Sequence, residues 1–209
     1  PVATERSTVA GRSDEPPRDD PGWATQRERM VADQLAARGI RDRAVLAAMR
    51  LVPRERFVPP ALRRRAYEDG ALSIGRGQTI SQPFMVARMT EALHLDVWTD
   101  AHQAQVPHVL DVGTGSGYQA AILAAMGVRV TTIERDPELA DRATRVFTDL
   151  GITVRAVVGD GSLGYPADAP YAGIVVGAAA PDVPAPLVEQ LEDGGRLVLP
   201  VGPPDRQEL

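Results

Sequence analysis

The sequence contains no cysteine, no lysine and no asparagine, and the first of these absences limits its chemistry most. Without cysteine there can be no disulfide, no thiolate nucleophile and no cysteine-ligated metal. Only three histidines are present, His94, His102 and His108, so we expect no metal site. All 23 basic residues are arginine, which we interpret as a bias of genome composition and not as a sign of mechanism.

Long apolar runs and an excess of basic charge are also absent. No apolar run approaches the roughly 20 residues that span a bilayer, and the first 22 residues lack the apolar core of a secretory signal. The net charge of −5 argues against a nucleic-acid binder, which usually carries a basic face. The triplet Arg63–Arg65 is interpreted as a solvated helix face. We therefore expect a monomeric, cytoplasmic protein with neither a membrane nor a nucleic-acid partner.

Composition divides the chain into three parts. Residues 1–22 are rich in proline, acids and arginine and poor in large apolar residues, which predicts a disordered tail. We expect residues 23–106 to form an N-terminal helical and substrate-loop region. Its sequence predicts helices over 25–39 and 42–52, a turn and short helix over 53–67, and another helix from Pro83. Residues 107–209 predict an α/β core that forms one compact domain with 23–106.

The core shows strands and helices in alternation, which indicates an open, mostly parallel sheet with right-handed crossovers and helices on both faces. The strands are predicted at 107–113, 128–134, 153–160, 172–180 and 196–202, and the helices at 118–127, 135–151 and 185–195. The sequence stops directly after the fifth strand, so we expect C-terminal strands of the sheet to be missing from it.

A glycine-rich loop, "DVGTGSGY", follows the first predicted strand of the core. In open α/β sheets the ligand binds at such strand ends, where Gly113 and Gly115 allow a tight turn and close approach. A dinucleotide fingerprint requires a third glycine where this sequence has Tyr118, and no Lys-Ser/Thr follows to make a P-loop. Both of those interpretations are disfavoured.

Two acids are the last residues of the next two predicted strands. Glu134 lies 21 residues after Gly113, where a carboxylate can accept hydrogen bonds from both ribose hydroxyls. Asp160, within "GDG", could accept a hydrogen bond from an adenine amine. Taken singly, each acid is about as well explained by a cap or a turn. Together with the glycine loop they predict an S-adenosylmethionine pocket.

The sequence resembles the protein-L-isoaspartate (D-aspartate) O-methyltransferase family from about Met30 to Gly202. The matching words are "VPRERFVP", "AYEDGALSIGRGQTISQPFMVARM", "LDVGTGSGYQAAILAAM", "GDGSLGYPADAPYAGIVVGAAAP" and "QLEDGGRLVLPVG". "GQTISQP" is the most diagnostic of them. The resemblance departs at Ser73, where a proline is usual. It implies a class I S-adenosylmethionine-dependent methyltransferase fold, an open Rossmann-like sheet with an N-terminal helical segment.

The resemblance also implies roles for individual residues. Ser81 would be the active residue, with Thr79 and Ile80 beside it at the substrate. The cofactor would be contacted by Pro83, Phe84, Met85, Val86, Asp111, Gly113, Gly115, Glu134, Asp160 and Gly161. A purely structural interpretation of Ser81, as the N-cap of the helix that starts near Pro83, is also open.

The activity implied is methyl transfer from S-adenosylmethionine to the free carboxylate of L-isoaspartyl, and also D-aspartyl, residues in damaged proteins and peptides. The methyl ester then closes to a succinimide, whose hydrolysis returns some normal aspartate. The segment "VVGAAAPDVP" offers nothing to hold a flat amine, which argues against methylation of bases. Two alternatives stay open: an enzyme dedicated to one peptide precursor, and a non-catalytic binding module of the same fold.

Overall fold

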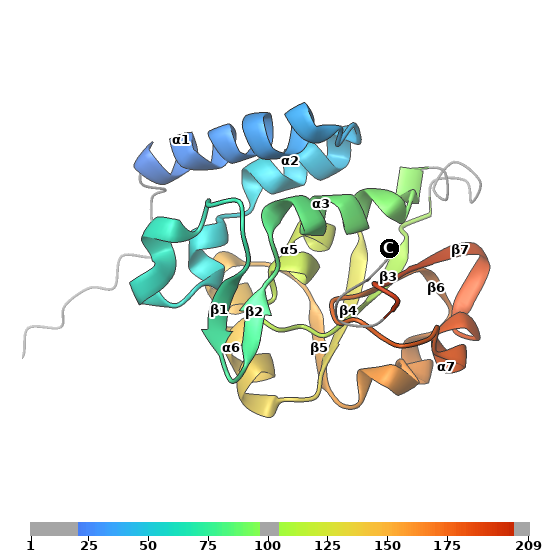
Figure 1. Ribbon diagram of the computed structural model, residues 1–209. Helices are drawn as coiled ribbons and strands as arrows, with labels where there is room; N and C mark the ends of the chain where they lie inside the picture. Colours follow the sequence, from blue (N-terminus) through green and yellow to red (C-terminus); the bar gives the residue numbers. More distant parts are fainter. Residues whose placement is uncertain (1–20, 97–104, 203–209) are drawn as a thin grey trace, which may run out of the picture.

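The computed structural model describes residues 21–96 and 105–202 (Figure 1). The predicted disordered tail lies outside the described residues except for Pro21 and Gly22. These two residues already belong to the first helix, α1 (Pro21–Arg29), which therefore begins two residues before the expected boundary. Proline is well suited to a first helical position because its missing N–H would have no partner there.

Five parallel strands form the central sheet in the order β5-β4-β3-β6-β7. They are β3 (His108–Val112), β4 (Arg129–Glu134), β5 (Arg155–Val158), β6 (Tyr171–Val176) and β7 (Leu191–Val198). The chain runs outward from β3 to β5 and then returns to the other side of β3. The carboxyl ends of β3 and β6 therefore form the switch point, where open α/β sheets bind their ligands.

The helices of this half are α5 (Tyr118–Ala125), α6 (Pro137–Leu150) and α7 (Ala185–Val188). The sequence predicted α6 well, since Asp136 caps its start and Gly151 ends it in the left-handed conformation. The helix predicted over 185–195 is wrong beyond Val188. The "LEDGG" segment belongs to β7 instead, with Leu191 paired to Tyr171 and a register shift that follows.

The glycines at the end of that wrongly predicted helix explain the error. Gly194 has a φ of +80°, and a Cβ on Gly195 would lie 2.9 Å from the Tyr171 carbonyl oxygen. Both positions need glycine, but for an irregularity inside a strand and not for the end of a helix. The two glycines were therefore interpreted as the end of a helix, whereas they lie at an irregularity of a strand.

The N-terminal region contributes a second layer of helices above α5 (Figure 1). Helix α1 continues through η1 (Met30–Leu35) and η2 (Ala36–Arg38), and is followed by α2 (Arg43–Leu51), by the short helices η3 (Arg54–Phe57) and η4 (Pro60–Arg65), and by α3 (Pro83–Ala92). Val31, Met49 and Val86 of this region belong to the same buried cluster as Val109 and Ile122 of the α/β half. Within the described ranges, no helix combines the length and apolarity that crossing a membrane would require.

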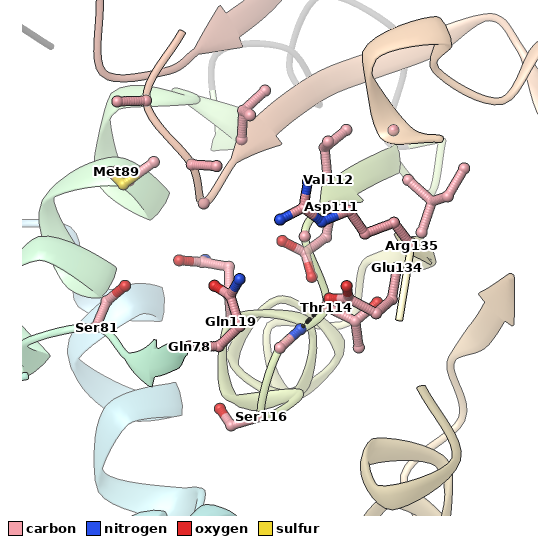
Figure 2. A pocket seen from close by; sticks show the side chains of 18 of the residues that line it. Gln78, Ser81, Met89, Asp111, Val112, Thr114, Ser116, Gln119, Glu134 and Arg135 are labelled. Carbon is pink, nitrogen blue, oxygen red and sulfur yellow. Dashed lines mark hydrogen bonds between the residues drawn. The ribbon is translucent and has the colours of Figure 1, made fainter. Parts of the chain in front are cut away.

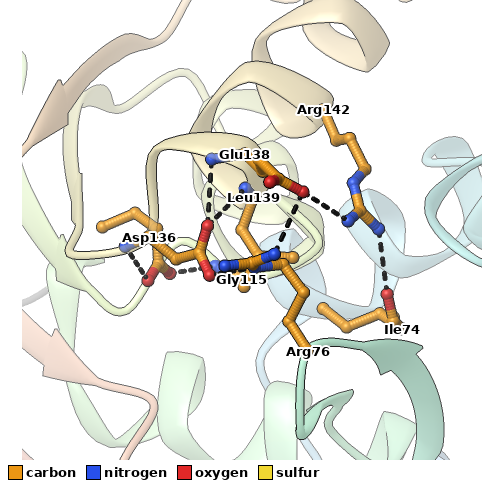
Figure 3. Close-up of polar contacts among 8 residues, drawn as sticks. Ile74, Arg76, Gly115, Asp136, Glu138, Leu139 and Arg142 are labelled. Carbon is orange, nitrogen blue, oxygen red and sulfur yellow. Dashed lines mark hydrogen bonds and ion pairs between the residues drawn. The ribbon is translucent and has the colours of Figure 1, made fainter.

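A small antiparallel hairpin precedes α3 and was not predicted as such. Its strands are β1 (Leu72–Gly75) and β2 (Gln78–Ile80), and Arg76 at its tip has a positive φ of 55°. Arg76 pairs with Asp136 and with Glu138 at the start of α6. Arg142 of α6 donates a hydrogen bond to the carbonyl of Ile74, at 3.2 Å (Figure 3). These contacts hold the hairpin over the glycine loop.

Candidate active site

A cavity of about 480 Å³ lies at the switch point of the sheet, beneath the β1–β2 hairpin. The turn after β2, helix α3, the glycine loop, the ends of β4 and β5 and the segment after β6 line it. Figure 2 shows Gln78, Ser81 and Met89 on one side, Asp111, Glu134 and Arg135 on the other, and Gln119 between Ser81 and Asp111. The predicted site residues that line the cavity are Thr79, Ile80, Ser81, Val86, Asp111, Gly113, Gly115, Glu134, Asp160 and Gly161.

Three predicted cofactor contacts do not line the cavity. Pro83 is buried in the first turn of α3, Met85 packs against the core, and the ring of Phe84 lies 3.9 Å from the guanidinium carbon of Arg38. A helix cannot present four consecutive residues to one side. Val86 and, one turn on, Met89 reach the cavity, as helical spacing requires.

The cavity also has lining residues that the sequence did not lead us to assign to the site. They include Gln78, Met89, Thr114, Ser116, Tyr118, Gln119, Arg135, Ser162 and the segment Gly177–Ala180. Helical spacing from Val86 could have found Met89, and helical spacing within α5 could have found Gln119. The other contacts follow from tertiary placement and carried no separate signal.

Ser81 lines the cavity, and its hydroxyl has no hydrogen-bond partner among the described residues. The N-cap of α3 is Gln82, with no side-chain cap, so the interpretation of Ser81 as an N-cap is wrong. Unlike the hydroxyl, the backbone carbonyl of Ser81 accepts a 2.7 Å hydrogen bond from Nη2 of Arg54. The turn is fixed through the main chain, which leaves the hydroxyl available.

Arg54 is fully buried and holds the Ser81 turn from behind. Its Nε donates to the carbonyl of Ala66 at 2.7 Å, and its guanidinium carbon lies 4.8 Å from the centroid of the Tyr118 ring. Burial lowers the pKa of Arg54, yet arginine keeps its charge in proteins. Arg54 therefore joins the segment after η4, the Ser81 turn and the start of α5.

The glycine loop depends on close packing behind it. Gly117 has a φ of +88°, and a Cβ there would lie 2.7 Å from Cζ of Phe147 on α6. The third glycine of "GTGSG" therefore lets α5 start directly against α6. The first two glycines of the loop, Gly113 and Gly115, line the cavity.

Glu134 anchors this loop with one carboxylate oxygen and the start of α6 with the other. Oε2 accepts a hydrogen bond from the Gly115 N–H at 2.9 Å, and Oε1 accepts one from the Asp136 N–H at 3.0 Å. Each carboxylate oxygen has a second lone pair, and Glu134 lines the cavity. Glu134 therefore has a structural role together with the capacity to accept hydrogen bonds from a ligand.

Asp111 is completely buried at the end of β3 and carries one oxygen without a partner. Oδ2 accepts a 2.8 Å hydrogen bond from the Thr132 hydroxyl, whereas Oδ1 has no hydrogen-bond partner among the described residues. Burial raises the pKa of Asp111 to about 7, the Thr132 hydrogen bond lowers it, and the charge of Glu134 raises it. A buried oxygen of this kind at a cavity wall is well placed to receive a cation or a donor.

Asp160 lies at the end of β5 and combines a turn role with exposure to the cavity. Its Oδ1 accepts hydrogen bonds from the N–H and the hydroxyl of Ser162, at 3.0 and 2.8 Å, and these bonds lower its pKa. It thereby caps the short helix η5 (Gly161–Leu163). A Cβ on Gly161 would lie 2.5 Å from Cγ1 of Val112, so only glycine fits against this wall.

A parallel sheet of this order, with a glycine loop and successive acids at its switch point, is a class I Rossmann-like methyltransferase fold. Residues 25–209 match the family model described as protein-L-isoaspartate(D-aspartate) O-methyltransferase. The protein-L-isoaspartate O-methyltransferase of Methanoculleus marisnigri is 55% identical over 185 residues, which are 88% of this chain and 80% of that protein.

Solved structures agree with this match. One named protein-L-isoaspartate O-methyltransferase is 31% identical with a TM-score of 0.72, over 84% of this chain and 55% of that one. A second, a putative member from Plasmodium falciparum in complex with S-adenosyl-L-homocysteine, shares the fold at 24% identity. Its TM-score is 0.71, over 87% of this chain and 86% of that one. This chain belongs to the protein-L-isoaspartate(D-aspartate) O-methyltransferase family.

Proposed function

We propose that this protein transfers the methyl group of S-adenosylmethionine to the free carboxylate of L-isoaspartyl, and also D-aspartyl, residues in damaged proteins and peptides. The observation that carries the proposal is that one cavity is lined by Ser81, whose hydroxyl has no hydrogen-bond partner among the described residues, and by the acids Asp111, Glu134 and Asp160. Family membership points to the same activity.

The cofactor side of the cavity fits S-adenosylmethionine by the chemistry of its donors and acceptors. The unpartnered Oδ1 of Asp111 suits the ammonium of the methionine part, because that cation would favour ionisation of a carboxyl whose pKa burial has raised. Glu134 has lone pairs for the ribose hydroxyls, and the free oxygen of Asp160 for the adenine amine. When bound, the cofactor supplies a methyl group already activated on a sulfonium.

The acceptor side needs no general base, since a peptide carboxylate is ionised at neutral pH. The Ser81 hydroxyl donates a hydrogen bond to one carboxylate oxygen and so directs the other oxygen toward the methyl group. Arg54 keeps the Ser81 backbone in place, and Thr79 and Ile80 of the hairpin held by Arg76 line the cavity beside it. Alignment of this kind supplies most of what such a transfer requires.

The proposal includes isoaspartyl proteins and peptides as partners and a monomer acting in the cytoplasm. Analytical ultracentrifugation of the purified protein checks the oligomeric state, and fractionation of cells that express it checks the compartment. A sedimenting dimer would contradict the monomeric form.

Substitution of Ser81 by alanine tests the proposed roles directly. Ser81→Ala should reduce transfer to an isoaspartyl peptide by on the order of ten- to a hundredfold, because the aligning hydrogen bond is lost. Calorimetry with S-adenosylhomocysteine should give the same affinity as the wild type. Ser73→Ala, the same substitution at an exposed residue of β1 outside the cavity lining, is the matched control and should leave both values near those of the wild type. Unchanged transfer in Ser81→Ala would remove Ser81 from the reaction.

A further inference from the structure

Gln119, on the first turn of α5, has an amide whose orientation is fixed by a chain of hydrogen bonds. Its Nε2 lies 2.7 Å from Oγ1 of Thr90, and the Thr90 hydroxyl lies 2.7 Å from the carbonyl of Val86. That carbonyl can only accept, so the single proton of the Thr90 hydroxyl goes to it. Thr90 Oγ1 must then accept from Gln119, and the amide NH₂ points to Thr90.

The opposite atom of the amide, Oε1, is therefore held away from Thr90. Among the described residues Oε1 accepts no hydrogen bond, and Gln119 lines the cavity. Thr90 is buried in α3, so the chain of bonds that sets the orientation is shielded from water. The result is an acceptor of fixed direction in the cavity wall.

Gln119 and Ser81 both line the cavity, and Figure 2 shows Gln119 between Ser81 and Asp111. A fixed carbonyl oxygen repels a carboxylate and attracts an N–H group. Ser81 offers the complementary hydroxyl proton. The nearby Gln78 is exposed and its side-chain amide makes no hydrogen bond among the described residues, so that amide is free to turn. Gln119 is the oriented acceptor of the two.

We propose that Oε1 of Gln119 accepts a hydrogen bond from the backbone N–H of the isoaspartyl residue itself. This bond would contribute to the preference of the site for isoaspartate over aspartate. This inference rests on the proposed function. In an isoaspartyl residue the N–H and the free carboxylate are carried by the same carbon, whereas in aspartate the carboxylate lies one carbon further away. Ser81 and Gln119 together fit one distance between the N–H and the carboxylate. That distance differs between isoaspartate and aspartate by about one bond of 1.5 Å. Misplacement of that size is enough to cost on the order of a hundredfold in rate.

The test uses two isoaspartyl peptides that differ at one atom. In the second peptide, an ester oxygen replaces the N–H of the isoaspartyl residue. Wild-type protein should prefer the amide peptide by about three- to tenfold in kcat/KM, the value of one neutral hydrogen bond. Gln119→Met, which keeps the length of the side chain without the acceptor, should treat the two peptides alike. Its affinity for S-adenosylhomocysteine should stay within about twofold of the wild type.

Two further variants separate orientation from structure. Thr90→Val removes the hydroxyl that orients the amide and should reduce the preference without abolishing transfer. Thr144→Val removes a hydroxyl that makes the same bond to the carbonyl four residues earlier, on α6, outside the cavity lining. It should keep the full preference.

The outcomes separate this inference from the proposed function. Retention of the wild-type preference in Gln119→Met would overturn the role of Gln119 alone. Weaker cofactor binding in Gln119→Met, with equal losses on both peptides, would instead assign Oε1 to the cofactor and also overturn it. No transfer by the wild type to the amide peptide would overturn the proposed function and this inference with it.

Discussion

Replacement of Glu134 by glutamine perturbs the cofactor side of the cavity at one atom. The carboxylate of Glu134 accepts the N–H groups of Gly115 and Asp136, and an amide can accept only one of them while its NH₂ opposes the other. A charge-assisted hydrogen bond contributes about 1.5–3 kcal/mol. Glu134→Gln should therefore lose about that much free energy of unfolding.

The affinity for the cofactor should also fall if Glu134 accepts hydrogen bonds from the ribose hydroxyls. Loss of one charge-assisted bond of the same size corresponds to on the order of a ten- to hundredfold weaker affinity. Calorimetry with S-adenosylhomocysteine measures this, and urea unfolding measures the stability in parallel. Glu28→Gln is the matched control, since Glu28 pairs with Arg50 on the surface outside the cavity lining and its loss should leave the affinity unchanged. A destabilised Glu134→Gln with wild-type affinity would limit Glu134 to holding the loop.

Two further predictions concern stability. His108 is buried at the start of β3, and its pKa is lowered to about 4 by burial first and then by the charge of Arg129, against the opposing charge of Asp168. The unfolded chain takes up this proton first, so the contribution of neutral His108 is complete above about pH 6.5 and is lost as the pH falls toward 4. Urea unfolding at pH 7 and pH 4.5 should show a larger loss for the wild type than for His108→Gln, by about 1–2 kcal/mol; equal losses would show that His108 titrates normally. Gly117→Ala should cost about 2–4 kcal/mol, because of its φ of +88° and the ring of Phe147 2.7 Å from the added Cβ; a thermal melt checks this, and an unchanged melting temperature would show that Phe147 yields.

The sequence predicted the parts of the fold that local patterns specify. The five core strands are apolar segments bounded by glycine or by a change in residue composition. The caps Asp136 and Gly151 define the two ends of α6. The hairpin was missed because it depends on contacts across 60 residues, between Arg76 and Asp136. The helix expected to 195 was wrong because strand pairing with β6 outweighed local propensity.

The candidate site shows the same division. Asp111, Glu134 and Asp160 lie at the carboxyl ends of predicted strands, and parallel pairing brings these strand ends to one edge of the sheet. Pro83, Phe84 and Met85 are neighbours of Ser81 in sequence, but the rotation of α3 carries them away from the cavity. The unpartnered oxygen of Asp111 and the fixed amide of Gln119 depend on Thr132 and Thr90, which come from other elements. No local pattern specifies those pairs.

The proposed activity is tested most directly by the rates of methyl transfer to two peptides of one sequence, one with an isoaspartyl and one with a normal aspartyl residue. With wild-type protein and labelled S-adenosylmethionine, the isoaspartyl peptide should be methylated, and the aspartyl peptide should react at least on the order of a hundredfold more slowly. Equal rates on both peptides, or cofactor binding without transfer to either, would contradict the proposed function.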